Sequence, residues 1–259
     1  GYTVEPCDFK MEEELRTELS VKRVDLAFVA LHGRYGEDGL VQNFLEYLKI
    51  PYTGSTPAAS ALAFDKWASR KRFKEIGLPT PESILLENAR TALSVPFPPP
   101  WVVKPVCQGS SLGLSIVDTE ADLPSAIAEA FRHDRRVLIE TYIRGPELTV
   151  GILDGESLPV IQILPAARFY DYASKYVSEG TQFLIPAPIE EGVTRATQEA
   201  ALRAHEALGC GAFSRVDLLL SEAELPVILE VNTIPGLTAR SLLPRASTAS
   251  GISFLELCE

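Results

Sequence analysis

Apolar and polar residues alternate most clearly in one stretch near the C-terminal end, FSRVDLLLSEAELPVILEVNTIPGLT, residues 213–238. Two runs of aliphatic and β-branched residues, 214–220 and 227–232, are separated by a polar turn that contains a proline. This pattern is typical of a β-hairpin. Side chains in a strand alternate between its two faces. We therefore expect one face of the hairpin to be apolar core, made of Val216, Leu218, Leu229 and Val231.

The other face of this hairpin carries charge. Antiparallel pairing about the turn places Asp217 opposite Glu230 and Arg215 opposite Asn232. Two carboxylates and an amide that converge on an apolar sheet repel one another unless a cation lies between them. Oxygen ligands of this kind suit Mg²⁺ or Mn²⁺, and such sites commonly serve a nucleotide phosphate. The alternative is a solvated hairpin face that happens to be charged, and the residues alone leave both interpretations open.

The rest of the chain alternates between strand and helix patterns. The apolar run VDLAFVALHG at 24–33 is typical of a parallel strand, and the segment 56–77 is predicted to be a helix. Further strands are expected in RRVLIETYI and GPELTVGILD, and further helices in DLPSAIAEAFRH and EEGVTRATQEAALRAHEAL. Alternation of this kind is characteristic of an α/β protein.

Two loops have the composition of ligand-binding segments. In WVVKPVCQGSSLGLSIV a strand ends near Lys104, and the small residues after it leave backbone N–H groups free to meet an anion. The spacing is not that of a P-loop, and a plain structural turn fits equally well. The stretch 164–188 contains tyrosines, serines and a lysine without a regular period, which favours a loop that folds over a site. A solvated loop is the alternative.

Composition narrows the class of protein. The chain has 259 residues, more than one hydrophobic core usually organises, so two or three subdomains are expected. Its net charge of −11 argues against a nucleic-acid partner. No apolar run approaches the roughly 20 residues of a membrane span, so no membrane partner is expected. The four cysteines lack CxxC spacing, which favours reduced thiols in a cytoplasmic enzyme over a zinc site or disulfide framework.

Several stretches match one family in the same order along the chain: ALHGRYGEDG, PYTGS, the pair Asp65–Lys66, VVKPVCQGSSLG, VLIETYIRGPELTV, FYDYASKY, FSRVDLLL and LEVNTIPGLTARSLLP. On these motifs the chain resembles the ATP-grasp superfamily and, within it, the D-alanine–D-alanine ligase family. The resemblance implies an α/β (α+β) fold with an N-terminal parallel-sheet domain, 1–57, a central subdomain, 58–141, and a C-terminal subdomain, 142–259. The antiparallel sheets of the last two would clasp ATP, beside a mobile loop at 165–188.

The resemblance also assigns roles to individual residues. Those expected to bind ATP are Lys66, Lys104, Ser111, Glu140, Thr141, Ile143, Glu147, Phe169 and Lys175. Those expected to hold two Mg²⁺ (or Mn²⁺) ions are Asp217, Glu230 and Asn232. Those expected to bind the amino-acid substrates are His32, Tyr170, Tyr176, Arg215, Gly236 and Ser241. Catalytic roles are implied for Ser110, Lys175, Tyr176, Arg215 and Gly236.

The implied reaction joins two D-alanine molecules for peptidoglycan precursor synthesis. The carboxylate of one attacks the γ-phosphate of ATP, and the amine of the second displaces phosphate from the acyl phosphate. Relatives suggest a homodimer. One alternative is a related ligase that makes either the D-alanyl–D-lactate ester or another carboxylate–amine product. Tyr176 disfavours the ester. A second alternative is a protein that holds ATP without ligating anything.

The chain also departs from the family at its beginning. The family's first strand, its glycine loop and the following helix have no counterpart here, and with them goes the glutamate that would bind the first substrate's ammonium group. We therefore expect a fragment of a longer enzyme, with an interior edge of the N-terminal sheet left open.

Overall fold

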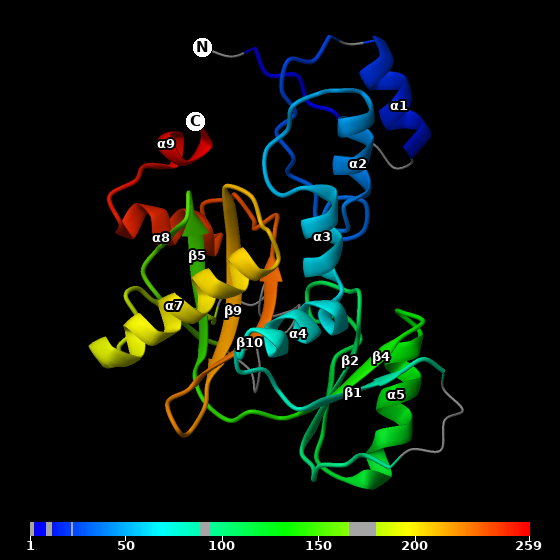
Figure 1. Cartoon of the computed structure of the whole chain (residues 1–259), viewed down its shortest axis with the longest axis vertical. Coiled ribbons are helices and arrows are strands. Elements are labelled where there is room, and N and C mark those ends of the chain that lie inside the picture. The colour runs from blue at the N-terminus through cyan, green and yellow to red at the C-terminus, as the bar shows by residue number, and fades with distance from the viewer. Residues whose placement is uncertain (1–2, 9–11, 22, 89–93, 166–179) are drawn as a thin grey trace.

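The computed structural model describes residues 3–8, 12–21, 23–88, 94–165 and 180–259. These residues form an N-terminal helical part and two antiparallel sheets (Figure 1). The smaller sheet lies at the lower right of Figure 1 and the larger sheet at the left, and helix α4, Lys66–Glu75, lies between them. We call the space between the two sheets the seam.

The N-terminal part is built on helices α1, Glu12–Val21, and α2, Leu40–Tyr47. The strand predicted at 24–33 is not formed, and in its place the described residues have one isolated parallel bridge, between Ala27 and Tyr52. The N–H of Ala27 donates to Pro51 O at 2.8 Å, and its carbonyl accepts from Thr53 N at 3.1 Å. A strand requires a neighbour along its whole length, and this segment has one for only a few residues.

The helix predicted over 56–77 is two helices, α3, Pro57–Phe64, and α4. The break is at Asp65, which has extended backbone angles (φ −83°, ψ 96°) and whose carboxylate accepts from Ala68 N at 2.9 Å. Aspartate is a strong N-cap residue because its side chain satisfies a backbone N–H that the first helical turn leaves open. Lys66 therefore begins a new helix, with its backbone N–H donating to Val106 O.

The smaller sheet has the strand order β1-β4-β2-β3 and is antiparallel throughout. Its strands are β1, Ser83–Leu86, β2, Trp101–Pro105, β3, Ser115–Val117, and β4, Val137–Thr141. The short helix η1, Glu120–Asp122, leads into α5, Leu123–Phe131, which packs its apolar side on one face of this sheet. The opposite face carries Lys104 and Glu140 toward the seam.

The larger sheet has the order β10-β9-β5-β7-β8, with β6 paired to β5. Its strands are β5, Glu147–Leu153, β6, Glu156–Ser157, β7, Ile161–Leu164, β8, Gln182–Leu184, β9, Phe213–Leu220, and β10, Pro226–Asn232. Helix α7, Glu191–Ala207, covers one face, and α8, Leu242–Ala249, covers part of the other. The short α9, Phe254–Cys258, follows α8. The uncovered part of that second face borders the seam.

The predicted hairpin is formed by β9 and β10, and its register is as expected. Glu230 pairs with Asp217, and Asn232 pairs with Arg215. One core residue was predicted wrongly, because a β-bulge lies between Ile228 and Glu230. The bulge adds one residue to β10, so Ile228 enters the core and Leu229 faces the cavity in the seam.

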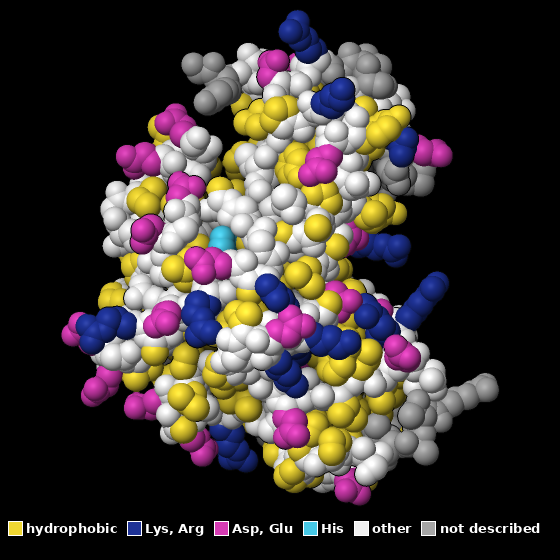
Figure 2. Space-filling view, in the orientation of Figure 1, with side chains coloured by type: hydrophobic (Ala, Val, Ile, Leu, Met, Phe, Trp, Pro, Cys, Tyr) yellow, Lys and Arg dark blue, Asp and Glu magenta, His cyan; other side chains and the backbone are white. Residues whose placement is uncertain are grey.

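The surface in Figure 2 mixes acidic and basic side chains, and lysines and arginines gather in the middle of that face, over α4. Helix α4 contributes Lys71, Arg72 and Lys74. Among the described residues, no helix has the length and apolar character required to cross a membrane.

The connection between β4 and β5 passes very close to the backbone at Leu220, and Gly145 is the residue that tests this approach. Its φ is +147°, and a Cβ there would lie 1.7 Å from the carbonyl oxygen of Leu220. Gly145→Ala is expected to lower the free energy of unfolding, with overpacking alone contributing about 1–3 kcal/mol. Gly192→Ala is the control, because no atom of the described residues lies within 4 Å of its Cβ position in α7. That change should stabilise by up to about 1 kcal/mol. Urea unfolding of both variants measures this, and equal effects would contradict the close approach.

Candidate functional site

Two adjoining cavities occupy the seam and its opening. The inner cavity, about 360 Å³, is lined by both sheets. The outer cavity, about 630 Å³, lies between the N-terminal part, the glycine loop and the segment after β10. Four residues border both cavities, Lys66, Gln108, Leu112 and Glu230. The two spaces therefore meet at the Lys66–Glu230 pair.

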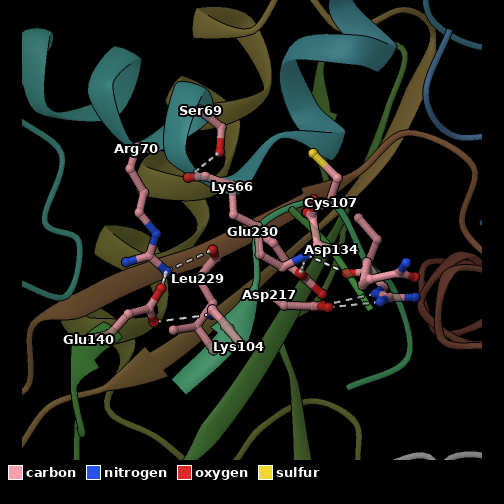
Figure 3. A network of polar contacts seen from close by, with 12 residues as sticks. Lys66, Ser69, Arg70, Lys104, Cys107, Asp134, Glu140, Asp217, Leu229 and Glu230 are labelled. Atoms are coloured by element: carbon pink, nitrogen blue, oxygen red, sulfur yellow. Dashed lines mark hydrogen bonds and ion pairs between the residues drawn. The ribbon is translucent and has the colours of Figure 1, made fainter. Parts of the chain in front are cut away.

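The wall of the inner cavity contains a chain of buried charges, shown in Figure 3. Lys104 Nζ lies 3.1 Å from one carboxylate oxygen of Glu140, and Arg70 Nη2 lies 2.8 Å from the other. Glu140 is only 2% exposed, and a charge buried this deeply is costly unless cations pair with it. Burial lowers the pKa of Lys104, with Glu140 acting in the opposite direction. The result is a cation whose charge is poorly solvated and faces an open cavity.

The end of β4 provides an edge for a planar polar ligand. The hydroxyl of Thr141 is buried and has no hydrogen-bond partner among the described residues. Thr141 lines the inner cavity together with Ile143 and Glu147. On β4 this hydroxyl is on the same side as Val137 and Ile139, whose side chains pack in the core, so a ligand in the cavity would meet the edge of the strand rather than the hydroxyl. The residues present fit a nucleobase and its ribose.

Lys66 connects the glycine loop to the hairpin. Its ammonium group lies 3.0 Å from Glu230 and donates to the carbonyl of Gln108 at 2.7 Å. In the loop that follows, Ser110 and Ser111 have φ values of 54° and 57°. Left-handed angles are unfavourable for residues other than glycine and often occur where a loop holds a ligand. The loop borders both cavities, through Ser111 on the inner side and Ser110 on the outer.

The charged face of the hairpin holds its carboxylates in fixed positions. Arg215 contacts both oxygens of Asp217, at 2.9 and 2.7 Å, and the hydroxyl of Thr149 donates to Asp217 at 2.6 Å. Asn232 Oδ1 accepts from Ile234 N at 2.9 Å. In the described segments no group of three or more His, Cys, Asp and Glu is placed to hold a metal ion. The donor set to be tested is therefore two carboxylates and an amide oxygen, which fits Mg²⁺ or Mn²⁺.

The outer cavity gathers groups suited to a small zwitterion. A methyl group at Gly236 would lie 2.7 Å from Ser241 Oγ and 4.0 Å from His32 Nε2, so these three residues converge. Ser241 is the N-cap of α8, and its hydroxyl is turned toward Thr238. The pKa of His32 is lowered, first by loss of hydration to the cavity walls and then by Arg215. Its imidazole therefore favours the neutral form.

All predicted site residues that the structure describes line one of the two cavities. On the inner cavity are Lys66, Lys104, Ser111, Glu140, Thr141, Ile143, Glu147, Asp217 and Glu230. On the outer cavity are His32, Ser110, Arg215, Asn232, Gly236 and Ser241, with Lys66 and Glu230 again. Four predicted residues lie outside the described residues, Phe169, Tyr170, Lys175 and Tyr176.

Three residues of the site were not predicted. Arg70 follows Lys66 by four positions, so the two share a helix face, and this spacing was the available signal. Thr149 pairs across β5 and β9 with Asp217, which required knowing that those strands are neighbours. Glu37 accepts from Gly33 N at 2.6 Å and lines the outer cavity. It lies within the motif ALHGRYGEDG, yet no role was assigned to it.

Comparison with known proteins identifies the family. The model "D-ala D-ala ligase C-terminus" matches residues 73–259, and "D-ala D-ala ligase N-terminus" matches residues 5–55. The chain belongs to the D-alanine–D-alanine ligase family. The resemblance of its motifs to that family is thereby confirmed.

Members of the family resemble the whole length of this chain. A D-alanine–D-alanine ligase of Syntrophotalea carbinolica is 46% identical over 259 residues, which is 100% of this chain and 84% of that protein. An Anaeromyxobacter ligase is 44% identical over 263 residues, with 100% and 85% covered. The D-alanine–D-alanine ligase of Bacillus anthracis, solved in complex with ATP, superposes with a TM-score of 0.85 at 35% identity. That match covers 99% of this chain and 83% of the other, and it confirms the expected ATP-grasp fold.

Glu37 provides a test of the electrostatics of the outer cavity. Burial, with repulsion from Glu230, raises the pKa of Glu37 above 4.5, although the Gly33 N–H opposes this. As pH rises past 4.5, the unfolded chain loses this proton before the folded chain does. The contribution of Glu37 to the free energy of unfolding therefore falls until pH exceeds the folded pKa.

Glu37→Gln has no proton to lose. Relative to the parent protein it is expected to gain stability as pH rises across that window, and the difference should then become constant. Urea unfolding of both proteins between about pH 4 and 8 measures the difference. A difference that is independent of pH, or that changes in the opposite sense, would show that Glu37 is not held in a poorly hydrated, negative environment.

Proposed function

We propose that this chain is an ATP-dependent ligase that joins two D-alanine molecules into D-alanyl-D-alanine, with release of ADP and phosphate. The observation that carries this proposal is the junction of the two cavities at Lys66 and Glu230. A nucleotide in the inner cavity would direct its terminal phosphate to that junction, where an amino acid in the outer cavity can reach it. Membership of the ligase family supplies the identity of the substrates.

The inner cavity supplies the groups required to bind ATP. We assign Lys66 and Lys104 to its phosphates, with the Ser111 loop beside them. The adenine edge is assigned to Glu140, Thr141 and Ile143, and the ribose hydroxyls to Glu147. All four of these residues line the inner cavity, which supports this orientation. Phe169 and Lys175 are assigned to the nucleotide by family resemblance alone.

Asp217, Glu230 and Asn232 are the residues that would hold Mg²⁺ or Mn²⁺. Bound there, two divalent ions would neutralise charge on the triphosphate and on the attacking carboxylate. Without bound ions, the chain's own cations balance these carboxylates, Arg215 for Asp217 and Lys66 for Glu230. Both cations face the cavities and are placed to turn toward substrate oxygens.

The reaction takes place in two steps. A carboxylate oxygen of the first D-alanine bonds to the γ-phosphorus of ATP, and the bond from that phosphorus to the β-γ bridging oxygen breaks to release ADP. The amine of the second D-alanine then attacks the acyl carbon, loses a proton, and phosphate leaves. The guanidinium of Arg215 and the N–H of Gly236 are assigned to the oxyanion that forms at that carbon, because both border the outer cavity.

The amino-acid pocket follows from the same cavity. Ser241, at the N-terminus of α8, is assigned to the carboxylate of the second D-alanine, since helix N-termini favour anions. His32 and Ser110 border the pocket from the N-terminal part and the glycine loop. Tyr170 and Tyr176 are assigned by family resemblance alone, with Tyr176 selecting the amine over a hydroxy acid.

The proposal also covers the domain boundaries of the chain, its location in the cell and its oligomeric state. We assign residues 1–57 to the N-terminal domain, 58–141 to the central subdomain and 142–259 to the C-terminal subdomain with the loop 165–188. A cytoplasmic role in peptidoglycan precursor synthesis accords with the four cysteines, none of which forms a disulfide within the described residues. A homodimer is proposed on family resemblance.

Product analysis tests the function directly. The chain is incubated with ATP, Mg²⁺ and D-alanine, and the products are resolved by mass, with D-lactate and D-serine supplied as competing acceptors. We expect D-alanyl-D-alanine in a one-to-one ratio with ADP, and little product from the competitors. ATP binding without any dipeptide, or a preference for a competing acceptor, would contradict the proposal.

Glu230→Gln tests the assignment of the hairpin carboxylates. Loss of this charge is expected to reduce kcat on the order of 100-fold or more, because it removes a group that would hold the metal ions at the reacting phosphate. The side chain is 28% exposed, so the fold should persist. Glu222→Gln, in the exposed turn of the same hairpin, is the control and should leave kcat unchanged. Normal turnover and metal dependence in Glu230→Gln would remove this residue from the metal site.

A further inference from the structure

Arg70 is the most deeply buried charged side chain beside the cavities, at 1% exposure, and it contacts neither cavity. It lies one helical turn after Lys66 on the same face of α4. Its guanidinium approaches Glu140 on the smaller sheet at 2.8 Å. It also donates to the carbonyl of Leu229 on the larger sheet at 3.4 Å. One side chain thus contacts both walls of the seam (Figure 3).

The two contacts of Arg70 lie next to one group assigned to the nucleotide, Lys104, and one assigned to its metal ions, Glu230. Glu140 holds Lys104 through its other oxygen, at 3.1 Å. Leu229 is the bulged residue of β10, directly before Glu230. A third contact, to the carbonyl of Pro81 at 3.5 Å, fixes the segment that leads into β1. The position of Lys104 relative to Glu230 therefore depends on the geometry of one guanidinium.

A contribution to the stability of the fold does not by itself explain why Arg70 is buried against Glu140. A buried ion pair often contributes less to stability than apolar residues of the same volume, because desolvation offsets the Coulomb attraction. Here the cost is increased, since Arg70 Nε is buried without a hydrogen-bond partner among the described residues. The contact with Glu140 is an ion pair that lacks the direction of a full hydrogen bond. What the guanidinium supplies instead is contact with both sheets, because its Nη2 lies against Glu140 and the carbonyl of Leu229 while its Nη1 donates to the carbonyl of Pro81.

Arg70 also shares the charge of Glu140 with Lys104. Because two cations divide one carboxylate, Lys104 is held less tightly than in a simple pair, and its ammonium group lines the open inner cavity. An incoming phosphate can draw Lys104 away without leaving Glu140 unpaired, since Arg70 stays. This avoids the large cost of an isolated buried charge at the moment of binding.

We propose that Arg70 is a positioning residue for the nucleotide, which sets Lys104 on the smaller sheet and Glu230 on the larger sheet at the separation that the ATP phosphates require. This inference rests on the proposed ATP-dependent ligase function. It predicts an effect on the use of ATP and little effect on the use of D-alanine, because the amino-acid pocket lies on the other side of the Lys66–Glu230 junction.

The test compares Arg70→Lys and Arg70→Met with Arg72→Met. Arg72 is a matched control on the same helix, since it too contacts one carboxylate, Glu75 at 3.0 Å, and one backbone carbonyl, Ala207 at 3.1 Å. Its side chain is 47% exposed and outside both cavities. Arg70→Lys keeps the positive charge, but its side chain is one bond shorter than the reach of Nη2 and it has no second nitrogen for the carbonyl of Pro81. Arg70→Met removes the charge and keeps much of the volume.

We expect the KM for ATP to rise on the order of tenfold or more in both Arg70 variants, as for the loss of a charged hydrogen bond. The KM for D-alanine at saturating ATP should change less than about twofold, which is within the spread expected of sites that do not interact. Arg72→Met should leave all values unchanged. Circular dichroism at the assay temperature establishes that each variant is folded. If Arg70→Met does not fold, the KM values of Arg70→Lys alone test the proposal.

The outcomes distinguish a failure of the Arg70 proposal from a failure of the proposed ligase function. A smaller folded fraction lowers only the apparent kcat, so unchanged KM values with reduced kcat would assign Arg70 to stability and overturn the proposal. Wild-type KM for ATP in folded Arg70→Lys, equal rises in the KM of both substrates, or failure of both variants to fold would also overturn it. If the unmodified chain forms no dipeptide from ATP and D-alanine, the proposed function fails first, and this inference fails with it.

Discussion

The structure depends on one constraint, that carboxylates placed between two sheets must each be matched by a cation. Glu140, Asp217 and Glu230 border the inner cavity, and each has a lysine or arginine within about 3 Å. Two of the pairs, Lys66–Glu230 and Arg70–Glu140, connect helix α4 to the larger and the smaller sheet. The same pairs leave Lys66 and Lys104 facing open space, so the charges that fix the architecture also define a site for a polyanion.

Local backbone features place those charges. The N-cap at Asp65 ends α3 and starts α4, so Lys66 emerges at the junction of the cavities. Arg136 Nη2 holds the same aspartate at 2.7 Å, which connects the start of α4 to β4. The bulge in β10 turns Leu229 toward the inner cavity and keeps Glu230 opposite Asp217. Short-range preferences of single residues therefore set distances across the whole seam.

Much of this site was predictable from the sequence because its pattern is local. The β9–β10 hairpin has a clear alternation and a polar turn, so the pairing of Asp217 with Glu230 could be derived correctly. The bulge could not be predicted, because no residue in VILEVN indicates one, and Leu229 was therefore predicted on the wrong face. Arg70 and Leu229 are 159 residues apart, and only the folded chain shows their contact. The prediction of a strand at 24–33 was wrong for a related reason. An apolar pattern does not show how many neighbouring strands a segment will pair with.

The most direct test of the account is whether ATP requires a divalent ion to enter the seam. Calorimetric titration of the chain with ATP, without D-alanine, is performed with Mg²⁺ and again with a chelator. Asp217 and Glu230 would repel a bare triphosphate, so we predict affinity lower on the order of tenfold or more when the metal is removed. Equal affinity in both titrations would contradict it, because the paired carboxylates would then have no part in holding the nucleotide.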